Sequence, residues 1–342
     1  MKLGWHIGYW GRSMPQGIPQ TLVEIERLGY DSAWTAESWG SDAFTPLAWW
    51  GASTSTIRLG TNLAQISART PAATAMAAIT MDHLSDGRFC LGLGVSGPQV
   101  VEGWYGQRFN KPLARTREYV GIVRRILARE DRLTNDGPEY PIPAKDGMGL
   151  GKALNVMTHP RRADLPIFLG AEGPKNVALA AELADGWFPI FYAPRHEELY
   201  AESLVEGFAR EGARRTAETF EVLPTVNVSI SDDIEAAYDK LRPTLALYIG
   251  GMGAKEMNFH ADVFRRLGYE QAVEEIQSLF LDGKQNEAIA AVPNAMVDEI
   301  CLVGSKAKVR ADLEAWKESR VTTILVGGSI DTLRTMAELV LG

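Results

Sequence analysis

Apolar residues recur along the chain in short runs that alternate with segments where they are spaced three or four positions apart. The short runs predict strands at residues 3–9, 32–36, 57–61, 88–94, 166–170, 186–190, 220–230 and 321–328. The spaced segments predict helices at residues 18–28, 44–54, 71–84, 111–129, 174–184, 195–211, 305–318 and 331–341. This alternation favours an α/β fold of the TIM-barrel type, a (β/α)8 barrel, over an open doubly wound sheet.

Two segments interrupt the alternation. Residues 131–160 contain the turn signal Asn135-Asp136-Gly137-Pro138 and predict a small hairpin. Residues 232–296 contain helical runs at 233–241, 256–267, 270–281 and 285–291 without a good strand, and form a helical insertion before the last strand. This insertion is a candidate lid or homodimer surface, especially in its Met252–Met257 region. We expect one domain, residues 1–342, that carries both insertions.

The stretch 59–106 limits the fold most. Thr70 suits a helix N-cap, Pro71 suits the first helical position, and Gly87 suits the turn that ends the helix. The stretch therefore reads as strand, helix and strand, and such parallel units place ligands at the carboxyl ends of their strands. We expect the loops at 62–69 and 96–105 to face one common site.

Composition and charge narrow the functional classes. The 342 residues are 46% hydrophobic, which is enough for a large core. The net charge is −8, and no stretch combines bases with aromatic residues, which argues against a nucleic-acid partner. No apolar run reaches the length of a membrane span and the N-terminus is not typical of a signal peptide, so we expect a cytoplasmic protein without a membrane partner. Cys90 and Cys301 lie in apolar runs and are expected to be buried thiols.

The loop after the fifth strand is a candidate ligand site. Its residues are Gly170, Ala171, Glu172, Gly173 and Pro174. The glycines let the backbone approach a ligand, and free N–H groups at the start of the next helix suit a phosphate. The alternative is that Gly-Pro serves only to turn the chain.

A second candidate lies at the end of the second strand, where Glu37 could bind a ligand or move a proton. The alternative is an ion pair between Glu37 and Arg12 or Arg69. Trp39 could stack on a flat ligand or cap the core. The histidines show no metal-binding spacing, so we expect no metal, and His6 in the first strand could be a core residue. Gly92-Leu93-Gly94 with Gly97 has the wrong spacing for a dinucleotide fingerprint.

Several motifs together are familiar. They are "LGT", "ARTPAATAMAAITMDHLSDGRFCLGLG", "SGP", "LGAEGP" and "LVGSKAKVRADLEAWKESRVTTILVGG". Their succession resembles the bacterial-luciferase-like superfamily, and within it the branch that uses the deazaflavin coenzyme F420. The resemblance covers roughly residues 1–130, 165–230 and 297–342 and says little about the helical insertion.

The resemblance implies a barrel whose mouth holds the deazaflavin ring. Similar proteins have a non-proline cis peptide bond after the third strand, and its expected place here is Asn62–Leu63. The residues expected to bind the cofactor are Thr61, Asn62, Leu63 and Gln65 at the ring face, Ser96 and Gly97 at the ring edge, and residues 170–174 at the phosphate-bearing tail.

The chain departs from related sugar-phosphate dehydrogenases at the proton donor. Those enzymes carry an Asp-His pair after strand two and an acid after the glycine of the strand-four loop, where this chain has Glu37-Ser38 and Pro98. We therefore select His6, Glu37 and Tyr105 as candidate catalytic residues. The aromatic residues Tyr9, Trp39 and Trp104 near the mouth indicate an apolar small-molecule substrate.

Three functions remain open at this stage. The first is an F420-dependent oxidoreductase that exchanges a hydride between the deazaflavin C5 carbon and a carbonyl compound, an alcohol or an activated alkene. The second is a monooxygenase that uses reduced FMN and oxygen. The third is a barrel that binds a cofactor without catalysis.

Overall fold

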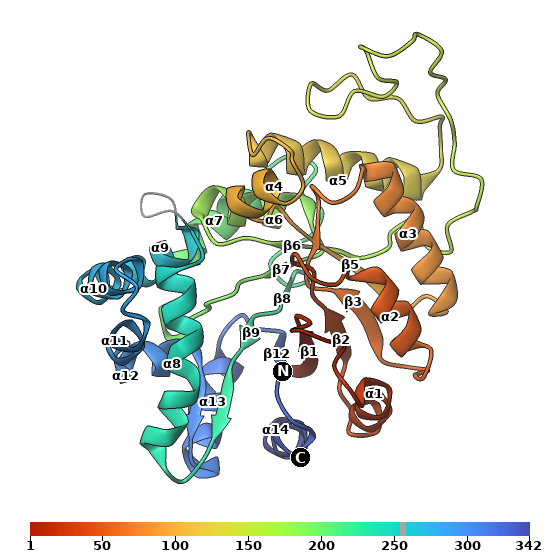
Figure 1. The fold of residues 1–342 in the computed structure, drawn as a ribbon. Coiled ribbons are helices and arrows are strands. Elements are labelled where there is room, and N and C mark those ends of the chain that lie inside the picture. The colour runs from red at the N-terminus through yellow and green to blue at the C-terminus, as the bar shows by residue number, and fades with distance from the viewer. Residues whose placement is uncertain (254–257) are drawn as a thin grey trace.

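A computed structural model describes residues 1–253 and 258–342, and its parallel strands form the predicted barrel (Figure 1). The barrel strands are β1 (Lys2–Gly8), β2 (Ser32–Thr35), β3 (Arg58–Thr61), β5 (Phe89–Gly94), β6 (Ile167–Gly170), β7 (Gly186–Phe188), β8 (Glu221–Val222), β9 (Thr225–Val226) and β12 (Thr323–Val326). Their order in the sheet is β8-β7-β6-β5-β3-β2-β1-β12-β9. The sheet closes because β8 and β9, at the two ends of this order, are separated in the chain only by Leu223 and Pro224.

Helices cover the outside of the sheet. They are α1 (Ile18–Arg27), α2 (Phe44–Gly51), α3 (Pro71–Leu84), α5 (Pro112–Ala128), α6 (Pro174–Leu183), α7 (Glu198–Phe208), α13 (Lys306–Glu318) and α14 (Ile330–Val340). A second, smaller core fills the barrel interior and includes Trp34, Phe168 and Phe188. A Cβ atom at Gly60 would lie 2.1 Å from the Trp34 ring, so the large indole requires a glycine on the neighbouring strand.

The local signals around α3 are confirmed. The Thr70 side chain accepts a hydrogen bond from the Ala73 N–H at 3.2 Å, and Pro71 is the first helical residue. Gly87 has φ of +83°, a left-handed conformation that glycine adopts without strain. The chain therefore turns directly from α3 into β5, as the sequence predicts.

The predicted strand at 220–230 is wrong as a single element. It forms β8 and β9, interrupted by Pro224, and then β10 (Val228–Ile230). Proline has no N–H to donate, but the Pro224 carbonyl accepts the Leu325 N–H at 2.9 Å, so the interrupted strand still joins β12. β10 leaves the barrel and pairs in parallel with β11 (Leu302–Gly304), a strand that was not predicted.

The helical insertion lies to one side of the barrel (Figure 1) and has a core of its own. Its helices are α8 (Ile234–Gly250), α9 (Phe259–Arg266), α10 (Glu270–Leu281), α11 (Gln285–Ala290) and α12 (Asn294–Ile300). The predicted run at 233–241 was too short, because α8 continues through Pro243 with Leu245 and Ile249 still buried. Helix α12 was not predicted. The Met252–Met257 region includes residues 254–257, which lie outside the described residues.

The predicted hairpin at 131–160 is confirmed only in part. Two isolated antiparallel bridges join Leu133 to Leu154 and Asn135 to Ile142. The remainder is an irregular loop that extends away from the barrel (Figure 1). One of its anchors is Glu118, whose carboxylate accepts hydrogen bonds from the backbone N–H groups of Glu139 and Tyr140.

Candidate active site

The loop after β3 forms the floor of the candidate site, at the carboxyl ends of the strands. The Asn62–Leu63 peptide bond is cis, at the predicted place. Thr61 is tied to β5 on both sides: its hydroxyl donates to the Gly92 carbonyl at 2.7 Å and accepts the Gly92 N–H at 3.0 Å. These bonds fix the point from which the loop leaves the barrel.

Leu63 brings three loops together. Cβ atoms added to Gly94 at the end of β5 and Gly170 at the end of β6 would lie 2.6 Å and 2.4 Å from Leu63 Cδ1. Both glycines therefore leave room for this side chain. The loop after β3 therefore meets the carboxyl ends of β5 and β6 at Leu63.

Glu37 is held by an ion pair. Its side chain is 3% exposed, and Oε1 lies 2.7 Å from Nη2 of Arg69. Oε2 accepts a hydrogen bond from Nη1 of Arg69 at 2.9 Å. One oxygen also accepts the Gln65 N–H at 2.8 Å. The partner is thus Arg69, one of the two expected bases. The pair fastens β4 (Ala64–Gln65), a short strand that was not predicted, to the end of β2.

Two polar atoms of this floor have no hydrogen-bond partner among the described residues. They are Asn62 Nδ2 and Gln65 Oε1, which are buried from solvent. A buried amide group without a partner is unfavourable. One donor and one acceptor at the barrel mouth therefore suit a polar heterocyclic ligand, and they fit the ring of a flavin or deazaflavin.

Ser96 and Gly97, which were predicted to line the ring edge, follow β5 after Val95. Ser96 has φ of +58°, and Gly97 is the N-cap of the short helix α4 (Pro98–Gly103). The expected loop at 96–105 is therefore partly helical. Pro98 is the first helical residue, a position where the N–H that proline lacks would have no partner within the helix.

His6 lies in β1 and contacts the same floor. Burial lowers the pKa of His6 to about 4, although a hydrogen bond with the Asn62 backbone acts in the opposite direction. The imidazole is therefore neutral near pH 7. A neutral imidazole ring has a free nitrogen lone pair and can accept a proton, so His6 remains a candidate base.

The His6 ring should titrate near pH 4 rather than near its usual value of about 6.5. The folded pKa is lowered, so the contribution of His6 to stability is complete above pH 6.5 and is lost as the pH falls toward 4. NMR titration of the ring nitrogens would measure the midpoint, with His6→Gln to assign the signal. A midpoint near 6.5 would contradict the desolvated environment.

Tyr105 lies beside the Glu37–Arg69 pair. Burial raises the pKa of its phenol, and the negative charge of Glu37 raises it further. Tyr105 therefore keeps its proton at neutral pH. This places two of the three candidate catalytic residues, Glu37 and Tyr105, close together.

The insertion adds residues that the sequence did not single out. Tyr9, after β1, forms a hydrogen bond with Tyr248 of α8, and burial raises the pKa of both phenols. Tyr248 packs edge-on against His260 of α9, with ring centroids 4.9 Å apart. His260 Nδ1 lies 2.8 Å from Glu172 Oε1. The insertion thus reaches the mouth of the barrel at both Tyr9 and the 170–174 loop.

Two backbone carbonyl groups of the 170–174 loop accept hydrogen bonds from side chains outside the loop. Trp187 Nε1 donates to the Ala171 carbonyl at 2.7 Å, and Arg266 donates to the Glu172 carbonyl at 2.8 Å. Gly173 is the N-cap of α6, with no side-chain cap in the described structure, and Pro174 is its first residue. This leaves the start of α6 open to an anion.

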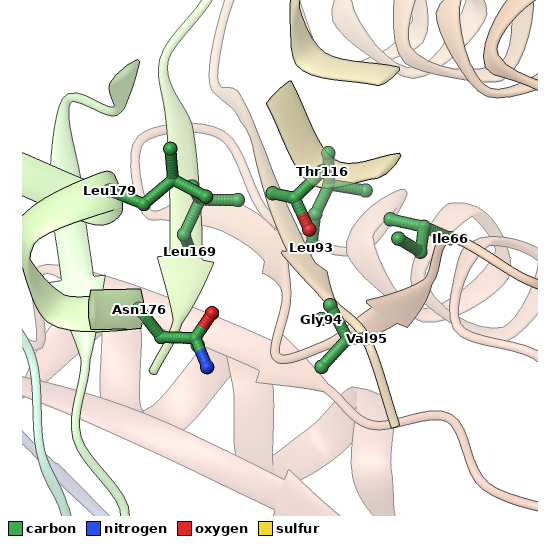
Figure 2. A pocket seen from close by; sticks show the side chains of 9 residues that line it. Ile66, Leu93, Gly94, Val95, Thr116, Leu169, Asn176 and Leu179 are labelled. Carbon is green, nitrogen blue, oxygen red and sulfur yellow. The ribbon is translucent and has the colours of Figure 1, made fainter. Parts of the chain in front are cut away.

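A hollow lies between the ends of strands β5 and β6 on one side and helices α5 and α6 on the other (Figure 2). It is a shallow, partly open hollow: the empty space is about 280 Å³ when open solvent is included, but only about 10 Å³ of it is accessible to the centre of a water-sized sphere. Its lining residues are Ile66, Leu93, Gly94, Val95, Thr116, Leu169, Gly170, Asn176 and Leu179. Figure 2 shows the Thr116 hydroxyl and the Asn176 amide on different sides of it. Thr116 is buried, and its hydroxyl has no partner among the described residues.

Two predicted substrate residues are open to solvent. The exposed fractions of Trp39 and Trp104 are 54% and 64%, so neither caps the core. Trp39 follows the Glu37 carboxylate, and Trp104 ends α4. Within residues 1–253 and 258–342, no group of three or more His, Cys, Asp or Glu side chains is placed to hold a metal ion. No helix of this part is long and apolar enough to cross a membrane.

Comparison with known proteins agrees with this geometry. The family model described as luciferase-like monooxygenase matches residues 6–323. The chain belongs to this family. A protein of Mycobacterium tuberculosis described as a coenzyme F420-dependent oxidoreductase is 57% identical over 343 residues, with 99% of each chain covered. The 5,10-methylenetetrahydromethanopterin reductase of Archaeoglobus fulgidus is 27% identical over 306 residues, which cover 89% of this chain and 87% of the reductase.

The luciferase-like fold is also found in solved structures. The coenzyme F420-dependent tetrahydromethanopterin reductase of Methanopyrus kandleri superposes with a TM-score of 0.82 at 21% identity, covering 100% of this chain and 99% of the reductase. This likeness supports the barrel and its insertions as a fold. The predicted superfamily is confirmed by the family match over residues 6–323.

Proposed function

We propose that this protein is an F420-dependent oxidoreductase that transfers a hydride between the deazaflavin and a small carbonyl compound, alcohol or activated alkene. The observation that carries the proposal is the end-to-end match, at 57% identity, to a protein described as a coenzyme F420-dependent oxidoreductase. The site supports it through the unpartnered amide groups of Asn62 and Gln65 and the hollow beside them.

The described residues fit such a cofactor. Thr61, Asn62, Leu63 and Gln65 would hold the ring face, and Ser96 and Gly97 would hold its edge. The hollow of Figure 2 and the open start of α6 would take the phosphate, which the Thr116 hydroxyl and the Asn176 amide can hydrogen bond. When bound, the deazaflavin gives or takes the hydride at its C5 carbon.

Proton transfer falls to side chains around the mouth. Neutral His6 can accept a proton from an alcohol that is being oxidised. Tyr9 and Tyr105, whose pKa values are raised by burial, stay protonated and can donate to a carbonyl oxygen. Both Glu37 oxygens are engaged by Arg69, so we assign Glu37 to holding the Gln65 backbone in place.

A fluorescence titration with F420 and with FMN tests the proposal. F420 should bind, and FMN should bind more weakly. Tight binding of FMN without affinity for F420 would overturn the choice of cofactor and favour the monooxygenase, which oxygen consumption during turnover would then reveal. F420 binding without turnover over a broad panel of carbonyl compounds and alcohols would favour the non-catalytic barrel.

The tyrosines and tryptophans around the mouth are the basis for proposing an apolar substrate. Trp39 and Trp104 are exposed there, and Tyr9 is 54% exposed although its hydroxyl group, next to Tyr248, is desolvated. A homodimer and a cytoplasmic location remain proposals of the same kind. Size-exclusion chromatography with light scattering would measure the oligomeric state.

A further inference from the structure

We propose that Arg108 and Arg115 form a subsite that binds the anionic tail of the cofactor beyond its phosphate. This inference rests on the proposed use of F420. It concerns a second hollow, next to the one in Figure 2, at the junction between α4 and α5. Its lining residues are Ile66, Ser67, Val95, Val101, Arg108, Phe109, Asn110, Pro112 and Arg115.

The two hollows are neighbours, because Ile66 and Val95 line both of them. A ligand that occupies the first would need only to pass these two side chains to reach the second. The first contains the buried, unpartnered Thr116 hydroxyl, which marks the path of a polar group. Thr116 directly follows Arg115 in α5. One turn of helix therefore offers a hydroxyl to one hollow and a guanidinium group to the other.

The lining of the second hollow includes two arginines and no carboxylate. Neither Arg108 nor Arg115 has an ion pair within the part of the chain that the structure describes. The nearby carboxylates have other partners: Glu102 accepts the Phe109 N–H at 3.0 Å, and Glu139 pairs with Lys111 at 3.1 Å. Glu118 accepts backbone N–H groups of the 131–160 loop. The two arginines are thus free to bind an external anion.

Arg115 is also held in place. Its guanidinium carbon lies 4.9 Å above the centroid of the Tyr140 ring, a cation–π contact with the 131–160 loop. The seventeen-residue helix α5 begins nearby at Pro112, and its N-cap residue Lys111 makes no side-chain cap in the described structure, so the free N–H groups of the first turn add partial positive charge. An oriented guanidinium group suits a carboxylate or a phosphate better than a freely moving one.

The two candidate cofactors, F420 and FMN, differ in the anionic groups that could reach this subsite. FMN ends at its phosphate, whereas F420 continues from its phosphodiester into a chain of glutamates that carry several carboxylates. Only F420 can fill both hollows with anionic groups. The subsite would therefore contribute to the choice of F420 over FMN.

A double variant that neutralises both arginines tests the inference. Arg108→Gln with Arg115→Gln should weaken F420 binding about tenfold, as expected for two lost charge-assisted contacts. It should leave unchanged the binding of the deazaflavin riboside that lacks phosphate and tail. The F420 affinity of the double variant should also depend less on salt than that of the unchanged protein.

A matched control removes the same charge elsewhere. Arg27→Gln with Arg310→Gln alters two exposed arginines on α1 and α13 and should not change F420 binding. Unchanged F420 affinity in the Arg108/Arg115 variant would overturn the inference. So would an equal loss for the riboside, since the arginines would then act through the fold of the ring site. If the unchanged protein binds neither compound, the proposed function fails and the subsite fails with it.

Discussion

Asp185→Asn should lower the free energy of unfolding by about 3 kcal/mol, the range for removing one partner of a buried ion pair. The Asp185 side chain is 4% exposed at the start of β7 and faces the guanidinium groups of Arg124, Arg214 and Arg215. Its carboxylate also accepts the Ile167 N–H at 2.8 Å. An asparagine keeps this last bond but leaves three positive groups without a counter-ion. Urea unfolding would measure the loss.

The same substitution should change the response to acid. Burial raises the pKa of Asp185, but Arg124 and the other hydrogen-bond donors outweigh it, so the folded pKa lies below the usual value. The Asp185 contribution is therefore complete above the unfolded pKa of about 3.9 and is lost as the pH falls through the folded value. Below pH 4 the variant should lose stability less steeply than the unchanged protein.

Asp331→Asn is the control for the Asp185→Asn variant. The Asp331 side chain is 84% exposed, and its ion pair with Arg334 spans one turn of α14. Exposed pairs of this kind contribute little, so unfolding should hardly change. An Asp185→Asn protein as stable as Asp331→Asn would show that the arginine cluster is satisfied by solvent instead.

The barrel was predictable because its signals are local. Each strand is a short apolar run, and the turn at Gly87 and the cap at Thr70 depend only on neighbouring residues. The pairing of β10 with β11 was not predictable in this way. About seventy residues of insertion separate the two strands, and nothing in the run at 220–230 shows that its second half pairs outside the barrel.

The candidate site was predictable only where the chain itself brings residues together or where the family resemblance supplies a position. The Asn62–Leu63 cis bond came from the resemblance, whereas the sequence left Glu37 with two candidate partners, Arg12 and Arg69. Tyr248 and His260 had no motif to mark them. Their place at the mouth depends on how α8 and α9 pack, which periodicity within each helix does not reveal.

Gly92→Ala should destabilise the barrel and the cofactor site together. A Cβ atom at Gly92 would lie 1.9 Å from the Thr61 carbonyl oxygen and 2.9 Å from Phe188 Cε2, in the fully buried centre of β5. The nearest atom belongs to the backbone, so a side-chain rotation cannot relieve the contact. We expect a loss of about 3 kcal/mol, at the upper end for overpacking by one methyl group.

Gly92→Ala should also weaken cofactor binding, because the Thr61 carbonyl that it displaces is next to Asn62. Thr61 precedes Asn62, so β3 can make room for the methyl group only by moving the loop that carries the cis bond and the unpartnered amide groups. F420 binding should therefore fall even at temperatures where the variant is folded, as a titration alongside thermal unfolding would show. Gly121→Ala is the matched control, because its Cβ meets open space on α5 and should raise helix stability by up to about 1 kcal/mol without affecting binding. If Gly92→Ala instead binds F420 as tightly as Gly121→Ala, the position of the loop does not depend on the contact between β3 and β5.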